Sequence, residues 1–259
     1  MMNKAEIVPA NHVAIYEKFT DYPVNKAIQN LGFAAMHAAF RCTVQYVGDT
    51  EAVISEHTDA HKSLILAPNH HRNEDTPTLA SMVYEPPFKS LKGKTIIPAK
   101  AELFKNPLTR WFIPHMMAHP AFRAKDFAGL EYEQELRAQT RDALLKINID
   151  HIDNGGSIGL FPESTRNRLD PRVIQPLRRG IAEIARNVDD PDSVLIVPMG
   201  FWYKKTVGKG VLRLKPYVVV EEPFSPLFMT KDEVLQKTHS RIQSATLQAH
   251  DIVQAVLEL

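Results

Sequence analysis

Two short segments, more than eighty residues apart, contain the side chains of this chain that are best suited to chemistry. The first is Asn69-His70-His71-Arg72-Asn73-Glu74-Asp75, and the second is Phe161-Pro162-Glu163-Ser164-Thr165-Arg166. A histidine can act as a general base, a nearby carboxylate can orient its ring, and an arginine can bind an anionic substrate. Together the segments supply a candidate base, an acid to orient it and a cation.

His70 and Asp75 can form a pair only if the chain turns between them. Leu64 to Ala67 is an apolar run that predicts a buried strand, and Asp75-Thr76-Pro77 is typical of a helix start. Residues five apart point about 140° apart in a helix and to opposite faces in a strand. On a strand-to-helix loop, Asp75 can hold one imidazole nitrogen protonated and leave the other free to accept a proton. The spacing alone also fits a helix-capping Asp75 beside an ordinary loop histidine.

The second segment is also predicted to follow a strand. Asp153 to Gly156 ends a long polar helical pattern, and Ser157 to Phe161 then has the composition of a short strand. Glu163, Thr165 and Arg166 therefore come just after a strand end, where ligand sites gather in open α/β sheets. The guanidinium of Arg166 suits a phosphate, although most arginine-rich turns are simply solvated.

These segments resemble the first and third motifs of PlsC-type glycerolipid acyltransferases, N-H-x-x-x-x-D and F-P-E-G-T-R. Lys100 to Phe104, continued by Pro107, Trp111-Phe112 and a closing Arg123, is similar to the second motif, and Ile196 to Gly200 is similar to the fourth. The resemblance covers roughly residues 42 to 222. Ser164 departs from it, because the family usually has glycine there, and Ala121-Phe122 before Arg123 lacks an acidic residue often found in the family.

The resemblance implies a reaction and a role for each matching residue. His70, oriented by Asp75, would deprotonate a glycerol hydroxyl, which then attacks the carbonyl of an acyl thioester. The donor would be acyl-CoA or an acyl carrier protein thioester, and no cofactor is expected. The acceptor would be 1-acylglycerol 3-phosphate in phospholipid synthesis, with glycerol 3-phosphate or another lysophospholipid as alternatives. The implied substrate-binding residues are Arg123, Glu163, Ser164, Thr165 and Arg166.

Three other interpretations remain open at this point. Read as H-H-x-x-x-D, the first segment resembles condensation-domain and chloramphenicol-acetyltransferase-like enzymes, in which His71 would be the base; those enzymes lack the downstream Phe-Pro-Glu-x-Thr-Arg segment. His70, His71, Glu74 and Asp75 are all potential metal ligands, but no second ligand cluster stands out and no metal is predicted. A non-catalytic lipid-binding protein on the same fold is the third. The single Cys42 is expected to be a small apolar strand residue rather than a nucleophile.

The composition fits a globular protein that meets a lipid. The chain has 259 residues, 44% of them hydrophobic, and a net charge of +1, which gives no general attraction to nucleic acid. No signal-peptide pattern or run of about twenty apolar residues occurs, so we expect a cytoplasmic protein, peripheral at the inner membrane surface. Either residues 24–40, with an apolar helical stripe, or Phe201 to Tyr203 could touch the bilayer, although both patterns more often face a protein core.

The order of elements predicts an α/β fold with a mixed, mostly parallel sheet flanked by helices. Residues 1–41 and 223–259 are expected to form N- and C-terminal helical segments around an acyltransferase core of residues 42–222. The C-terminal part begins with a capping box at Thr230 to Glu233. Further strands are expected near 43–47, 95–99, 194–199 and 211–220, and helices near 76–84, 131–153 and 177–187.

Overall fold

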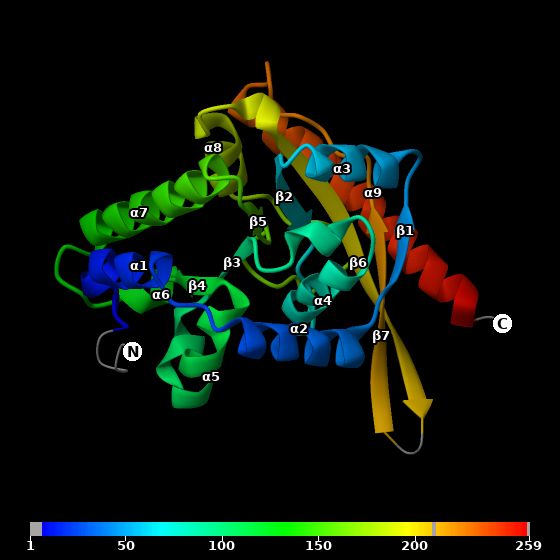
Figure 1. Ribbon diagram of the computed structural model, residues 1–259, viewed down its shortest axis with the longest axis horizontal. Coiled ribbons are helices and arrows are strands. Elements are labelled where there is room, and N and C mark those ends of the chain that lie inside the picture. The colour runs from blue at the N-terminus through cyan, green and yellow to red at the C-terminus, as the bar shows by residue number, and fades with distance from the viewer. Residues whose placement is uncertain (1–6, 209–210, 258–259) are drawn as a thin grey trace.

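The computed structural model of the protein describes residues 7–208 and 211–257. A seven-stranded sheet with the order β1-β7-β6-β2-β5-β3-β4 runs through its centre (Figure 1). The strands are β1 (Thr43–Tyr46), β2 (Ser63–Pro68), β3 (Thr95–Lys100), β4 (Ala118–Ala121), β5 (Ser157–Gly159), β6 (Val194–Gly208) and β7 (Val211–Val220).

The sheet is mostly parallel, as the sequence predicts. Strands β6, β2, β5, β3 and β4 all pair in parallel. Among the pairs of named strands in the described residues, β6 and β7 pair antiparallel, and β1 runs parallel to β7 at the sheet edge. Strand β4 was not expected, because Ala118-His119-Pro120-Ala121 lacks a strand pattern; a proline is tolerated there because β4 is an edge strand.

Helices cover both faces of the sheet, so the central strand β2 is buried along its whole length. On one face Ile65 and Ala67 pack against the α7 and α8 side, while Leu64 and Leu66 face α3 and α4 on the other. The helices are α1 (His12–Thr20), α2 (Lys26–Phe40), α3 (Thr50–Asp59), α4 (Asp75–Ser81), α5 (Pro107–Phe112), α6 (Ala124–Phe127), α7 (Glu133–Asp153), α8 (Gly180–Asn187) and α9 (Lys231–Leu257).

The predicted helices are present, but the short helices α5 and α6 were not predicted. Helix α4 begins at Asp75 and continues as a 3₁₀ turn over Met82–Tyr84, which together match the predicted 76–84. Helix α3 was not predicted. After residue 223 one long helix, α9, packs along β6 and β7, and it starts with the expected capping box: Glu233 accepts a hydrogen bond from Thr230 N at 2.7 Å, and Thr230 Oγ1 accepts one from Glu233 N at 3.3 Å.

The two segments considered for membrane contact lie in different environments. Helix α2 buries Phe33 in the protein but leaves Leu31 72% exposed on its outer side. Phe201 and Tyr203 are buried in the core, and Trp202 is half-buried between two histidine rings. Within the described residues, no helix has the length and apolar character needed to cross a membrane.

Candidate active site

The sheet order brings both sequence segments to the same end of the sheet, where the parallel strands have their carboxyl ends. The loop that carries His70 follows β2, and the loop that carries Glu163 follows β5, its parallel neighbour. Strands β3 and β4 lie next in the sheet and end at Lys100 and Ala121, so the second motif reaches the same end of the sheet. The carboxyl ends of parallel strands commonly form ligand sites. The structure therefore assembles the first three motifs in one place.

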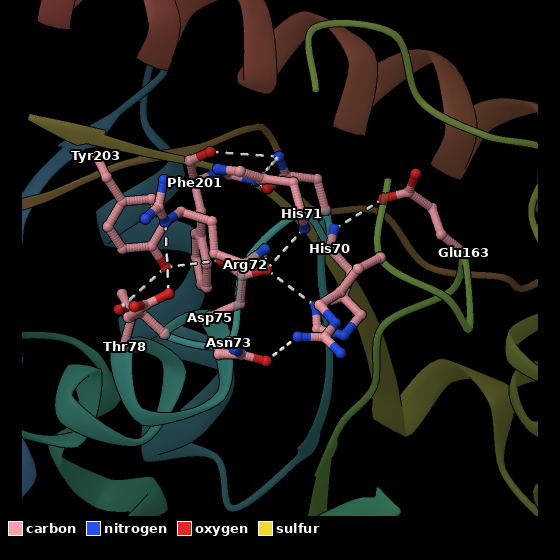
Figure 2. Close-up of polar contacts among 12 residues, drawn as sticks. His70, His71, Arg72, Asn73, Asp75, Thr78, Glu163, Phe201 and Tyr203 are labelled. Carbon is pink, nitrogen blue, oxygen red and sulfur yellow. Dashed lines mark hydrogen bonds and ion pairs between the residues drawn. The ribbon is translucent and has the colours of Figure 1, made fainter. Parts of the chain in front are cut away.

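His70 and Asp75 form a hydrogen-bonded pair (Figure 2). The distance from His70 Nδ1 to Asp75 Oδ2 is 2.9 Å, which leaves Nε2 of the ring available to accept a proton. The His70 side chain is 12% exposed and its ring packs on Phe161 with centroids 4.4 Å apart. The loop between β2 and α4 supplies the turn that this spacing requires.

Four donors hold the Asp75 carboxylate, which is fully buried. Besides His70, the backbone N–H groups of His71 and Arg72 each donate to Oδ2 at 2.7 Å. The Tyr203 hydroxyl donates to Oδ1 at 2.7 Å. Burial opposes ionisation of Asp75, but the hydrogen bonds and the neighbouring imidazoles outweigh it and hold the pKa of Asp75 below its usual value. Asp75 is therefore an anion suited to orienting an imidazole.

Glu163 fixes the backbone of His70. Its Oε1 accepts a hydrogen bond from His70 N at 2.7 Å, and its Oε2 accepts one from Gln175 N at 2.9 Å. The His70 carbonyl in turn accepts a hydrogen bond from Asn167 N at 2.7 Å. Burial raises the pKa of Glu163 despite these donors, and the charge of Asp75 adds to the rise. The resemblance assigns Glu163 to substrate binding; in the structure both of its oxygens are occupied by backbone amides.

His71 occupies a different position from the one an H-H-x-x-x-D enzyme would need. Its Nδ1 lies 3.2 Å from Asn69 Nδ2, and its ring stacks on Trp202 with centroids 5.3 Å apart. Burial lowers its pKa. Only the backbone N–H of His71 contacts Asp75. The ring paired with the carboxylate is thus that of His70.

Cationic side chains lie at the same end of the sheet as the His70–Asp75 pair. Burial lowers the pKa of Lys100, and the positive charges of Arg166 and Arg123 lower it further. Arg166 contacts the Asn73 side chain, which ties it to the His70 loop. Arg123 pairs with Glu102 at 2.6 Å. Lys100 was not among the predicted site residues, although it opens the second motif in the sequence.

Ser164 and Thr165 complete the turn after Glu163. Ser164 has φ 57°, the left-handed conformation that favours glycine, so this turn holds a serine in a conformation that glycine adopts more easily. Its side chain is exposed. Thr165 Oγ1 donates to Gln175 Oε1 at 3.2 Å, on the segment that also binds Glu163. Both residues lie at the solvent side of the site.

Metal-ligating side chains and the Cys42 thiol are two other kinds of reactive group. Among residues 7–208 and 211–257, no three His, Cys, Asp or Glu side chains are grouped as metal ligands would be. Cys42 is buried, and burial raises the pKa of its thiol to about 11. A thiol with so high a pKa is a weak nucleophile at neutral pH, in agreement with its expected packing role.

Comparisons with known proteins identify the family of this chain. The family model described as Acyltransferase matches residues 50–202, more than half of the chain. The crystal structure of the 1-acyl-sn-glycerophosphate acyltransferase PlsC from Thermotoga maritima is similar with a TM-score of 0.54 and 19% identity, over 94% of this chain and 90% of that one. No curated protein matches in sequence. The chain therefore belongs to the acyltransferase family, as its motifs indicated, and is an acyltransferase with a PlsC-type fold.

Proposed function

We propose that this enzyme transfers a fatty acyl group from acyl-CoA or an acyl carrier protein thioester to a hydroxyl of 1-acylglycerol 3-phosphate. The observation that carries the proposal is the His70–Asp75 pair, 2.9 Å apart, with Arg166 held against Asn73 of the same loop. A base next to a cationic group suits an acceptor that carries both a hydroxyl and a phosphate.

The proposed reaction is a direct transfer between two bound substrates. Asp75 keeps the proton on Nδ1 of His70, so Nε2 takes the proton of the acceptor hydroxyl as its oxygen attacks the thioester carbonyl. The new C–O ester bond forms, the C–S bond breaks, and the thiolate leaves with the bonding electron pair. His70 can return its proton to that thiolate. Orientation of the two substrates supplies much of the remaining rate acceleration.

Apolar surface close to the pair suits the acyl chain. A narrow cavity of about 20 Å³ lies between the sheet and helices α2 and α4, lined by Leu66, Leu79, Met82 and Met116 among others. Leu79 is one helical turn from Asp75, so the cavity begins near the reacting groups. A fatty chain is larger than this space, and we propose that the flexible methionines and leucines move to admit it.

Membrane contact is part of the proposal, because the acceptor is a lipid. The outer side of α2 carries Leu31 among exposed alanines, and α5 beside it exposes Leu108 by 71% and Trp111 by 40% (Figure 1). Such a surface can enter the interfacial region of a bilayer without crossing it. We propose that these helices bring the enzyme to the inner membrane surface.

The experiment is thiol release from palmitoyl-CoA and from a palmitoyl–acyl carrier protein thioester. Each donor is tested with lysophosphatidate, with glycerol 3-phosphate or with no acceptor, using wild type and His70→Ala. We expect acceptor-dependent release that is highest with lysophosphatidate and falls by about a hundredfold or more in His70→Ala, the range of a positioned general base.

Each outcome of this assay is informative. Faster release with glycerol 3-phosphate would identify that compound as the acceptor and would leave the proposed roles of His70 and Asp75 unchanged. A His70→Ala variant that keeps wild-type activity would show that His70 is not the base. Circular dichroism of the variant distinguishes a lost base from a lost fold.

A further inference from the structure

We infer that Tyr203 is a positioning residue of the acyl transfer: its hydroxyl holds the Asp75 carboxylate in the orientation that serves His70. The inference deepens the proposed function and rests on it. Tyr203 lies outside the motifs that carry the family resemblance, and neither its role nor that of Thr78 follows from them. The two contacting residues, Tyr203 and Asp75, are 128 positions apart in the chain.

The arrangement of donors around Asp75 gives Tyr203 this role. Oδ2 accepts hydrogen bonds from His70 Nδ1 and from the backbone N–H groups of His71 and Arg72. Oδ1 accepts its hydrogen bond from Tyr203, at 2.7 Å (Figure 2). A buried carboxylate oxygen without a donor is costly. Without the hydroxyl, the carboxylate could lower this cost by rotating, and Oδ2 would then leave His70.

Tyr203 is itself fixed by its surroundings. Its ring is 7% exposed and packs among the apolar side chains on the α4 face of the sheet. Its hydroxyl oxygen lies 3.2 Å from Thr78 Oγ1. Since the single tyrosine proton goes to the nearer, charged Asp75, the Thr78 hydroxyl can donate its own proton to Tyr203. A chain of hydrogen bonds therefore runs from Thr78 through Tyr203 and Asp75 to His70.

The register of β6 delivers the tyrosine to this place. Alternate residues Met199, Phe201 and Tyr203 face the α4 side of the sheet. The side chain of Asn69 accepts a hydrogen bond from Phe201 N at 2.7 Å and donates one to Phe201 O at 3.3 Å. The loop that carries His70 is thus bound to β6 two residues before Tyr203. This attachment fixes the distance between the loop and Tyr203.

The test is steady-state kinetics of Tyr203→Phe with the best donor and acceptor found for the wild type. This variant keeps the packed ring and removes the hydroxyl. We expect kcat to fall about tenfold, as for loss of one hydrogen bond to a charged group, with KM for both substrates within about twofold. Tyr217→Phe is the control: Tyr217 lies on β7, is also 7% exposed, and is not among the described groups that contact Asp75.

A second variant separates positioning from packing. Thr78→Val removes the hydroxyl behind Tyr203, and we expect it to lower kcat about threefold in the wild-type background. In the Tyr203→Phe background it should have no further effect, because both changes break the same chain. Effects that multiply would show independent packing roles and overturn the inference.

The inference and the proposed function can fail separately. If His70→Ala keeps wild-type activity, the catalytic pair itself is wrong. If His70→Ala is inactive and Tyr203→Phe keeps wild-type kcat, or changes only KM, Tyr203 does not position Asp75. Should Tyr203→Phe fail to fold, Thr78→Val alone decides: an unchanged kcat contradicts the hydrogen-bond chain, and a loss in kcat without a change in KM supports it.

Discussion

At the scale of single residues, burial separates the charged groups that organise the site from those that can meet substrate. Asp75 and Glu163 are 0% and 3% exposed, and the oxygens of both accept hydrogen bonds from protein groups. Arg166 and Lys100 remain partly exposed. A phosphate can therefore reach the cations but not the carboxylates.

Arg166→Ala should selectively weaken the binding of a phosphorylated acceptor. We expect its KM to rise about tenfold to a hundredfold, because hydrogen bonds to charged groups contribute about 1.5–3 kcal/mol, while KM for the thioester changes little. Arg172→Ala is the control, since Arg172 is exposed and paired with Asp170 at 3.0 Å. The measurement is KM for lysophosphatidate and for an uncharged monoacylglycerol. Equal weakening of both acceptors would contradict a phosphate role for Arg166.

At the scale of elements, the site depends on β6. This strand carries Tyr203, and its backbone at Phe201 is hydrogen-bonded to the side chain of Asn69. Helix α9 covers β6 on the face away from α4, where it approaches very closely at Gly200. A Cβ atom on Gly200 would lie 2.1 Å from the Ala245 carbonyl carbon in α9. Glycine is required there by the packing of helix on strand, not by a positive φ.

Gly200→Ala should therefore destabilise the protein by pushing α9 away from β6. We expect a loss of about 1–3 kcal/mol in the free energy of unfolding, the usual range for an overpacked core. Urea denaturation followed by circular dichroism measures it. Gly180→Ala is the matched control, since nothing lies within 4 Å of its Cβ position. Equal midpoints for the two variants would mean that α9 is not closely packed at Gly200.

At the scale of the whole molecule, the protein buries several histidines in neutral form. Burial lowers the pKa of His57, His71, His115 and His151, and it lowers that of His119 to about 3. In an unfolded chain these groups titrate near about 6.5. As pH falls below that value the unfolded state binds protons that the folded state does not, so stability is full above about pH 6.5 and is lost on acidification.

His119→Leu should reduce the loss of stability on acidification. His119 alone is expected to remove about 2 kcal/mol of stability between about pH 7 and pH 5, and a leucine removes that dependence. The measurement is the free energy of unfolding in urea at both pH values. His61→Asn, at an exposed position with φ 58°, is the control. A pH dependence in His119→Leu equal to that of wild type would contradict the buried neutral histidine.

The sequence by itself predicted most of the elements and the acyltransferase family of this protein. Local patterns were sufficient for the strand before His70, the helix start at Asp75 and the turn after Phe161, because apolar runs, caps and turn residues act within a few positions. The same patterns missed α3, α5, α6 and β4, whose segments carry no clear periodicity. The pairing of His70 with Asp75 was one of two arrangements that the spacing allowed, and the turn between β2 and α4 brings the two side chains together.

Only the tertiary structure decided how distant groups meet. The order β6-β2-β5-β3-β4 places Arg166 beside Asn73 and Tyr203 beside Asp75. It also turned Glu163 toward the His70 backbone and divided α2 into a buried and an exposed side. These contacts depend on which strands are neighbours and on which face each side chain lies. Residues so far apart in the chain share no local pattern from which that could be inferred.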